Sequence, residues 1–121
     1  MKVLIIDDTK SITDMLCSYL ELKGHECVPV NSGRNGLQLL ENENFDVVTL
    51  DIAMPEFSGF DVVDTLAKDN KIDNQNIIVL TAVPLSDQEE NQLKEKGVKK
   101  ILRKPVNLRT LLETMHSLEN D

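Results

Sequence analysis

The stretch Ile77-Ile78-Val79-Leu80 is the clearest strand in the sequence. It is apolar at every position and rich in β-branched residues, a pattern typical of a strand that is buried on both faces. Residues 3–6 and 47–50 are similarly apolar or β-branched, and residues 98–102 are a further strand candidate that includes two lysines. Residues 27–30 form a weaker candidate, because Pro29 indicates an edge strand. The sequence therefore predicts five short strands.

Amphipathic segments separate these strands. One helical face is formed by residues spaced three and four apart: Ile12, Met15, Leu16, Tyr19 and Leu20. Helix starts are indicated by Ser32 before residues 33–41, by a capping box from Ser86 to Glu89, and by Asn107 before the last helix. Five strands that alternate with five helices require parallel crossovers. We therefore predict an α/β fold, a flavodoxin-like doubly wound five-stranded parallel sheet with five helices.

The composition and charge of the chain argue against several classes of function. The chain has 121 residues and a formal net charge of −8, so we expect one domain over residues 1–121. This charge argues against nucleic acid as a partner, since phosphate backbones need a cationic surface. No apolar run is long enough to span a membrane, and the start does not resemble a signal peptide, so we expect a cytoplasmic protein with no membrane contact. Cys17 and Cys27 match no metal or redox spacing, which predicts two buried thiols in a reducing compartment.

Polar side chains follow four of the strands at their carboxyl ends: Asp7 and Asp8 after the first, Asp51 after the third, Thr81 after the fourth and Lys104 after the fifth. Any one of them has a simpler explanation as a helix cap or a turn residue. In an open parallel sheet, however, the carboxyl ends of the strands meet at one edge, where ligands bind. Five residues of complementary chemistry at that edge favour a binding site.

The chemistry of this set favours phosphoryl transfer. Three converging carboxylates repel one another unless a cation lies between them. Oxygen ligands select a hard ion, and because nothing resembles a calcium loop, we expect Mg²⁺. The cation, a lysine and a hydroxyl describe a pocket for a phosphoryl group, and an aspartate can act as its nucleophile.

The order and spacing of these motifs resemble the receiver domain of two-component response regulators. The matching pieces are Asp7-Asp8, Asp51, Met54-Pro55, Gly59, Thr81-Ala82 and Lys104-Pro105. The resemblance extends from Val3 to about Leu118 and leaves no room for an output module.

This resemblance implies a role for each acidic residue. Asp51 is the phospho-acceptor. Mg²⁺ is expected to bind the carboxylates of Asp8 and Asp51 and the carbonyl of Ala53, with Asp7 acting through water. We therefore expect a signalling domain and not an enzyme. The only reaction that it is expected to catalyse is phosphoryl transfer to itself.

The resemblance also implies that Lys104 pairs with the phosphoryl oxygens, that Thr81 hydrogen-bonds them in the active state, and that the Lys104-Pro105 peptide is cis. Two positions depart from the family pattern. Ile101 stands where an aromatic switch residue is common, and Val106 stands where phenylalanine is common. We therefore expect a monomer or a weak dimer with a transient partner.

The leading interpretation is a stand-alone regulator that takes a phosphoryl group from a histidine kinase or phosphotransfer protein and binds an unidentified output protein. Three alternatives stay open: a receiver-like scaffold that is not phosphorylated, the excised receiver of a longer regulator, and a metal-dependent phosphatase. The phosphatase would need an acid two residues after Asp51, where Ala53 stands. A phosphohistidine role for His25 or His116 is disfavoured by their positions at an edge strand and near the chain end.

Overall fold

The computed structural model of the chain describes residues 1–119. The strands are β1 (Lys2–Ile6), β2 (Glu26–Val30), β3 (Val47–Asp51), β4 (Ile77–Thr81) and β5 (Lys100–Arg103). The α-helices are α1 (Lys10–Leu22), α2 (Gly33–Asn42), α3 (Gly59–Lys68), α4 (Asp87–Lys96) and α5 (Leu108–Glu119). A short 3₁₀ helix, Ile72–Asn74, precedes β4.

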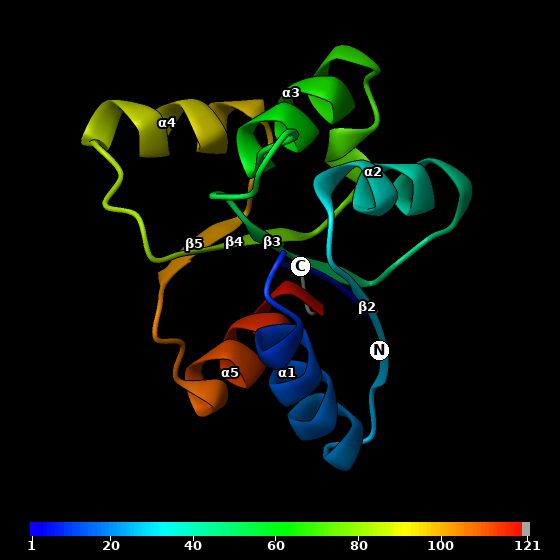
Figure 1. The fold of residues 1–121 in the computed structure, drawn as a ribbon. Coiled ribbons are helices and arrows are strands. Elements are labelled where there is room, and N and C mark those ends of the chain that lie inside the picture. Colours follow the sequence, from blue (N-terminus) through cyan, green and yellow to red (C-terminus); the bar gives the residue numbers. More distant parts are fainter. Residues whose placement is uncertain (120–121) are drawn as a thin grey trace.

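The five strands form one parallel sheet in the order β2-β1-β3-β4-β5, with helices on both faces. Helices α2, α3 and α4 cover one face, and α1 and α5 cover the other (Figure 1). Every residue of β3 and β4 is buried, as expected of central strands in a two-sided sandwich. The predicted fold is confirmed, and β2 lies at an edge as Pro29 indicated.

The three predicted helix starts are confirmed by side-chain hydrogen bonds. The hydroxyl of Ser32 accepts from the backbone of Asn35, and the carboxamide of Asn107 accepts from the backbone of Thr110. Ser86 and Glu89 form the expected reciprocal capping box. A second capping box, between Ser58 and Asp61, opens α3 and was not predicted.

Two local expectations are wrong. The last strand begins at Lys100 and not at residue 98, because the backbone N–H of Val98 donates to Leu93 at the end of α4. Met15 lies on the expected helical face but its side chain is 46% exposed. Leu16 and Leu20, which are fully buried, already fill the contact between α1 and the sheet.

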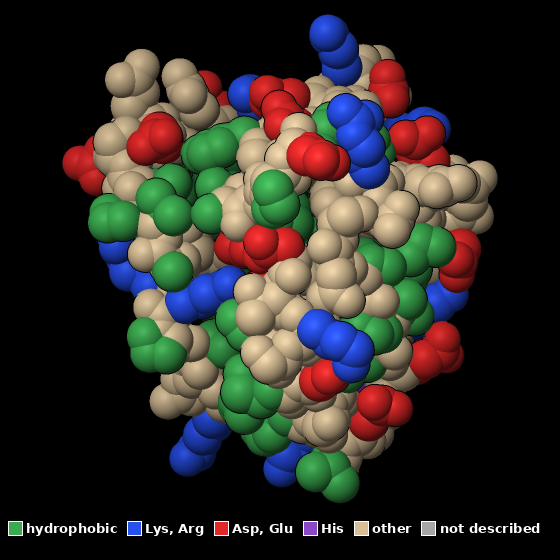
Figure 2. All heavy atoms as spheres, in the orientation of Figure 1, with side chains coloured by type: hydrophobic (Ala, Val, Ile, Leu, Met, Phe, Trp, Pro, Cys, Tyr) green, Lys and Arg blue, Asp and Glu red, His purple; other side chains and the backbone are tan. Residues whose placement is uncertain are grey.

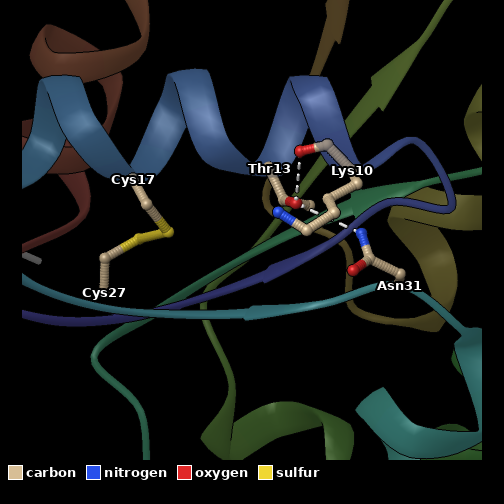
Figure 3. The surroundings of a disulfide bond; sticks show 5 residues. All are labelled: Lys10, Thr13, Cys17, Cys27 and Asn31. Atoms are coloured by element: carbon tan, nitrogen blue, oxygen red, sulfur yellow. Dashed lines mark hydrogen bonds between the residues drawn. A yellow bond between two sulfur atoms is a disulfide. The ribbon is translucent and has the colours of Figure 1, made fainter.

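The cysteine prediction is also wrong, because Cys17 and Cys27 form a disulfide (Figure 3). Their Cα atoms are 5.5 Å apart, and the bond joins α1 to the edge strand β2. The spacing of the two cysteines in the sequence could not show this pairing, since the pairing arises from the packing of α1 against β2. No helix among residues 1–119 is long and apolar enough to cross a membrane.

Reducing this disulfide is expected to lower the free energy of unfolding by about 2–3 kcal/mol, because the bond restricts the loop that it closes in the unfolded chain. Urea unfolding of the oxidised and the reduced protein measures the difference. The double variant Cys17→Ala/Cys27→Ala is the control and should unfold identically with and without reductant. Overlapping transitions for the oxidised and reduced wild type would show that the bond does not contribute to stability.

Candidate functional site

The predicted acidic cluster forms at the carboxyl edge of the sheet. Ile6 and Leu50 are register partners on the neighbouring strands β1 and β3, so the residues that follow them meet. Carboxylate oxygens of Asp7, Asp8 and Asp51 all lie within 4.8 Å of one another. Figure 2 shows a small group of acidic side chains near the middle of this face, with a basic side chain beside it.

Burial differs among the three carboxylates. Asp7 is 2% exposed and Asp51 is 5% exposed, whereas Asp8 faces solvent. The backbone N–H of Thr9 donates to Oδ1 of Asp7 at 2.9 Å, which fixes that carboxylate. The cluster therefore has a rigid, buried side and an open side from which a ligand can enter.

Lys104 is the cation that enters this cluster. Its Nζ lies 2.6 Å from Oδ2 of Asp7 and 3.5 Å from Oδ1 of Asp51, and its side chain is 15% exposed. The Lys104-Pro105 peptide is cis, as expected, and the Lys104 N–H donates to the carbonyl of Thr81 at 2.9 Å. The segment after β5 is thereby tied to the end of β4.

The pKa values of these groups reflect their burial and mutual charge. Burial, followed by the negative charge of Asp7, raises the pKa of the Asp51 carboxyl above its usual 3.8, although Lys104 partly opposes this. For Lys104, burial favours the neutral form, but the hydrogen bond to Asp7 and the charge of Asp51 outweigh it and raise its pKa. The amine is charged at neutral pH, yet one amine does not balance three carboxylates.

The donor set fits a hard divalent cation. All three side chains offer oxygen, and their separation allows one ion to contact them together. Ala53 lies two residues after Asp51 in an exposed loop, and its backbone N–H hydrogen-bonds the Asp51 carboxylate. The use of the Ala53 carbonyl as a ligand stays a prediction.

Thr81 is the last residue of β4, the strand beside β3, but its hydroxyl makes its hydrogen bonds within its own loop. It is 3% exposed, and its hydroxyl donates to the carbonyl of Val83 at 3.0 Å and accepts from the Val83 N–H at 3.0 Å. The hydroxyl is thus held by its own loop. Contact with a group on Asp51 would require these hydrogen bonds to break.

Asn31 supports the site and was missed in the sequence. Its side-chain amide donates to the backbone carbonyl of Asp7 at 2.8 Å and to the hydroxyl of Thr13 at 3.1 Å. Figure 3 shows this amide directed at Thr13. Asn31 directly follows β2, so the rule that found the other strand-end residues could also have found it.

The difference in stability between the wild type and Asp51→Asn is expected to depend on pH. Because the pKa of Asp51 is raised on folding, the native protein holds this proton more tightly than the unfolded chain does. The stabilisation is present below the unfolded pKa and is lost as pH rises through the higher folded pKa. The wild type should therefore lose stability relative to the variant as the pH rises from the usual pKa of 3.8 through the raised pKa of Asp51 in the folded protein. Urea unfolding with a chelator tests this, and a difference that stays constant with pH would contradict it.

Comparison with known proteins assigns nearly the whole chain to one protein family. The family model described as "Response regulator receiver domain" matches residues 3–116. Protein PilH of Pseudomonas aeruginosa is 34% identical over 119 residues, which are 97% of this chain and 96% of that protein. The polar-differentiation response regulator DivK of Brucella ovis is 27% identical, covering 98% of this chain and 96% of that protein.

Solved structures agree with this grouping. The chemotaxis protein CheY4 of Vibrio cholerae has a TM-score of 0.86 at 32% identity, with 97% of each chain covered. The response regulator TrrA of Thermotoga maritima, in complex with Mg²⁺ and BeF, has a TM-score of 0.80 at 29% identity, with 97% of each chain covered.

Proposed function

The chain belongs to the response regulator receiver domain family, and from this premise we propose that Asp51 accepts a phosphoryl group in a Mg²⁺-dependent reaction. The observation that carries the proposal is the pairing of a buried nucleophile, Asp51, with the partly buried ammonium of Lys104. Asp51 is 5% exposed, and Nζ of Lys104 lies 3.5 Å from its Oδ1. Family members signal in two-component systems, so the reaction here serves a switch and not metabolite turnover.

The reaction that this arrangement supports is an in-line displacement. A carboxylate oxygen of Asp51 attacks the phosphorus of the donor, an acyl phosphate bond forms, and the bond from phosphorus to the donor atom breaks. Asp7, Asp8 and Asp51 would hold Mg²⁺, which supplies charge neutralisation when it is bound. The ammonium of Lys104 compensates the charge of the transferred oxygens, because it already lies among the same carboxylates.

The proposed switch starts at Thr81. Phosphorylation adds about −1.5 to −2 charges beside a hydroxyl that is now held by the backbone of Val83. Exchange of those hydrogen bonds for one to the phosphoryl group would pull the loop of residues 82–85 inward. This loop leads directly into α4, so its movement would alter the face formed by α4, β5 and α5.

The expected partners follow from this reaction. A histidine kinase or phosphotransfer protein would donate the phosphoryl group, and an unidentified output protein would bind the altered face. Of the large side chains in α4, only Leu93 is both apolar and buried, and the helix is otherwise polar. This supports a transient complex, and a monomer or weak dimer, over an obligate apolar dimer. A single domain over residues 1–121 and a cytoplasmic location stay predictions.

One time course distinguishes the candidate functions. The protein is mixed with Mg²⁺ and acetyl phosphate, and intact mass and acetyl phosphate consumption are recorded together. A receiver gives one phosphoryl adduct per chain, dependent on Mg²⁺. Rapid consumption of many equivalents of donor would instead indicate a phosphatase, and no adduct would indicate a scaffold.

A further inference from the structure

The Cys17–Cys27 disulfide lies beside a second link between the same two elements (Figure 3). Thr13 and Cys17 are one turn apart on α1 and are both buried, so they belong to the stripe of the helix that packs inward. On the other side, Cys27 belongs to β2, and Asn31 directly follows that strand. The disulfide and the hydrogen bond from Asn31 to Thr13 therefore connect one edge strand to one helix.

The carboxyl end of β2 also holds Asp7, a member of the acidic cluster. The backbone N–H of Asp7 donates to the carbonyl of Val30, the last residue of β2, at 3.1 Å. The side-chain amide of Asn31 donates to the backbone carbonyl of Asp7 at 2.8 Å. The main chain of Asp7 is thus fixed on both sides by this end of β2. A shift of β2 would displace a carboxylate that Lys104 contacts.

As an edge strand, β2 is hydrogen-bonded to the sheet on one side only, through β1. Pro29 in this strand has no N–H to donate. None of the five residues of β2 is fully buried, in contrast to those of β3 and β4. Segments with few buried contacts open locally at a lower free energy than central strands. The covalent bond to α1 opposes such opening.

We propose that Cys17 and Cys27 form a redox switch, in which reduction of the disulfide by a dithiol loosens β2 and weakens Mg²⁺ binding at Asp7, Asp8 and Asp51. The reduced chain stays folded, because the buried central strands β3 and β4 do not depend on the bond. The inference rests on the proposed Mg²⁺ site and assigns a means of regulation to it.

The reduction is a thiol–disulfide exchange that starts at Cys27. Cys17 is 6% exposed, whereas Cys27 is only partly buried on the edge strand. A thiolate of the dithiol attacks Sγ of Cys27, a mixed disulfide forms, and Sγ of Cys17 leaves as a thiolate and takes up a proton. The second thiol of the reagent then attacks the mixed disulfide and releases Cys27 as a thiol. The protein gains two electrons and two protons, and the dithiol is oxidised to its own disulfide.

Calorimetric titration of the oxidised and the reduced protein with Mg²⁺ tests the proposal. We expect the reduced wild type to bind Mg²⁺ about fivefold or more weakly than the oxidised wild type. Circular dichroism should show that both forms are folded, so that the difference belongs to the native state. The variant Cys17→Ala/Cys27→Ala should bind Mg²⁺ as the reduced wild type does, with or without dithiothreitol.

A second measurement uses the reciprocity of linked equilibria and needs no phosphorylation. Mg²⁺ should make the disulfide harder to reduce, by the same factor by which the disulfide strengthens Mg²⁺ binding. Thiol alkylation and mass spectrometry give the oxidised fraction in mixtures of reduced and oxidised dithiothreitol, with and without Mg²⁺. In Asn31→Ala this factor should fall toward one, because the side-chain link from the end of β2 to Asp7 is lost. Asn35→Ala, a matched change at an exposed position of α2, should keep the wild-type factor.

Equal Mg²⁺ affinity of the two redox forms, or a redox equilibrium that Mg²⁺ leaves unchanged, overturns the proposal. A reduced chain that unfolds would show control of the whole fold and not of the site, and it would also overturn the proposal. An unchanged factor in Asn31→Ala would do the same, because it removes the proposed route. Absence of Mg²⁺ binding to the oxidised wild type would overturn the proposed function and this inference together, whereas equal binding to both forms overturns this inference alone.

Discussion

Replacing Asp51 with asparagine is expected to abolish the phosphoryl adduct that forms on the wild type with Mg²⁺ and acetyl phosphate. An amide is not a nucleophile of comparable strength, and it removes one of the three carboxylates that converge within 4.8 Å. Among residues 1–119, the only other carboxylate that pairs with Lys104 is that of Asp7, which Lys104 and the backbone of Thr9 already hold. The adduct should therefore vanish and not merely form more slowly.

The matched control is Asp14→Asn. Asp14 is an exposed aspartate on α1 that pairs with Lys10 outside the acidic cluster, so the charge change is the same and the site is untouched. This variant should form the adduct at the wild-type rate. An adduct of undiminished yield on Asp51→Asn would contradict the assignment of the acceptor.

Replacing Lys104 with alanine is expected to destabilise the protein strongly when Mg²⁺ is absent. The amine is 15% exposed, and its removal leaves the carboxylates of Asp7 and Asp51 buried without a cation. Breaking a buried pair in this way costs about 3–5 kcal/mol, and we expect a value of roughly 3 because the site has an open side. Urea unfolding with a chelator measures this loss.

Mg²⁺ should recover part of that stability, because the ion supplies positive charge to the same carboxylates. We therefore expect Mg²⁺ to stabilise Lys104→Ala more than it stabilises the wild type. Lys99→Ala is the control, since Lys99 is exposed and outside the cluster, and its stability should change by less than about 0.5 kcal/mol. Equal stability of Lys104→Ala and the wild type without Mg²⁺ would show that the pairing does not stabilise the fold.

The arrangement of the site was predictable wherever strand order alone decides it. Asp7 and Lys104 directly follow β1 and β5, and Asp51 is the last residue of β3, so a parallel sheet brings the three to one edge whatever the details of packing. The sequence could not show which hydrogen-bond partner each polar side chain takes. Thr81 bonds to its own loop through Val83, a choice that depends on the backbone path after β4.

Contacts that depend on how a helix settles against the sheet were also beyond the sequence. The face of α1 was identified, but its rotation decides that Met15 is 46% exposed and that Cys17 meets Cys27. Gly36 lies inside α2 although glycine is a weak helix former. Packing explains its presence, because a Cβ at this position would lie 2.5 Å from Cδ1 of Ile6. Helical periodicity gives the face of a helix, and only packing gives the contacts.

The central claim is that Asp51 carries the phosphoryl group, and chemical trapping tests it most directly. The protein is treated with acetyl phosphate and Mg²⁺, reduced with borohydride, which converts an acyl phosphate to an alcohol, and digested for tandem mass spectrometry. The account predicts homoserine in place of Asp51, in amounts that follow the phosphoryl adduct and disappear without Mg²⁺. Homoserine at Asp7 or Asp8, or an adduct that resists borohydride and maps to a histidine, would contradict it.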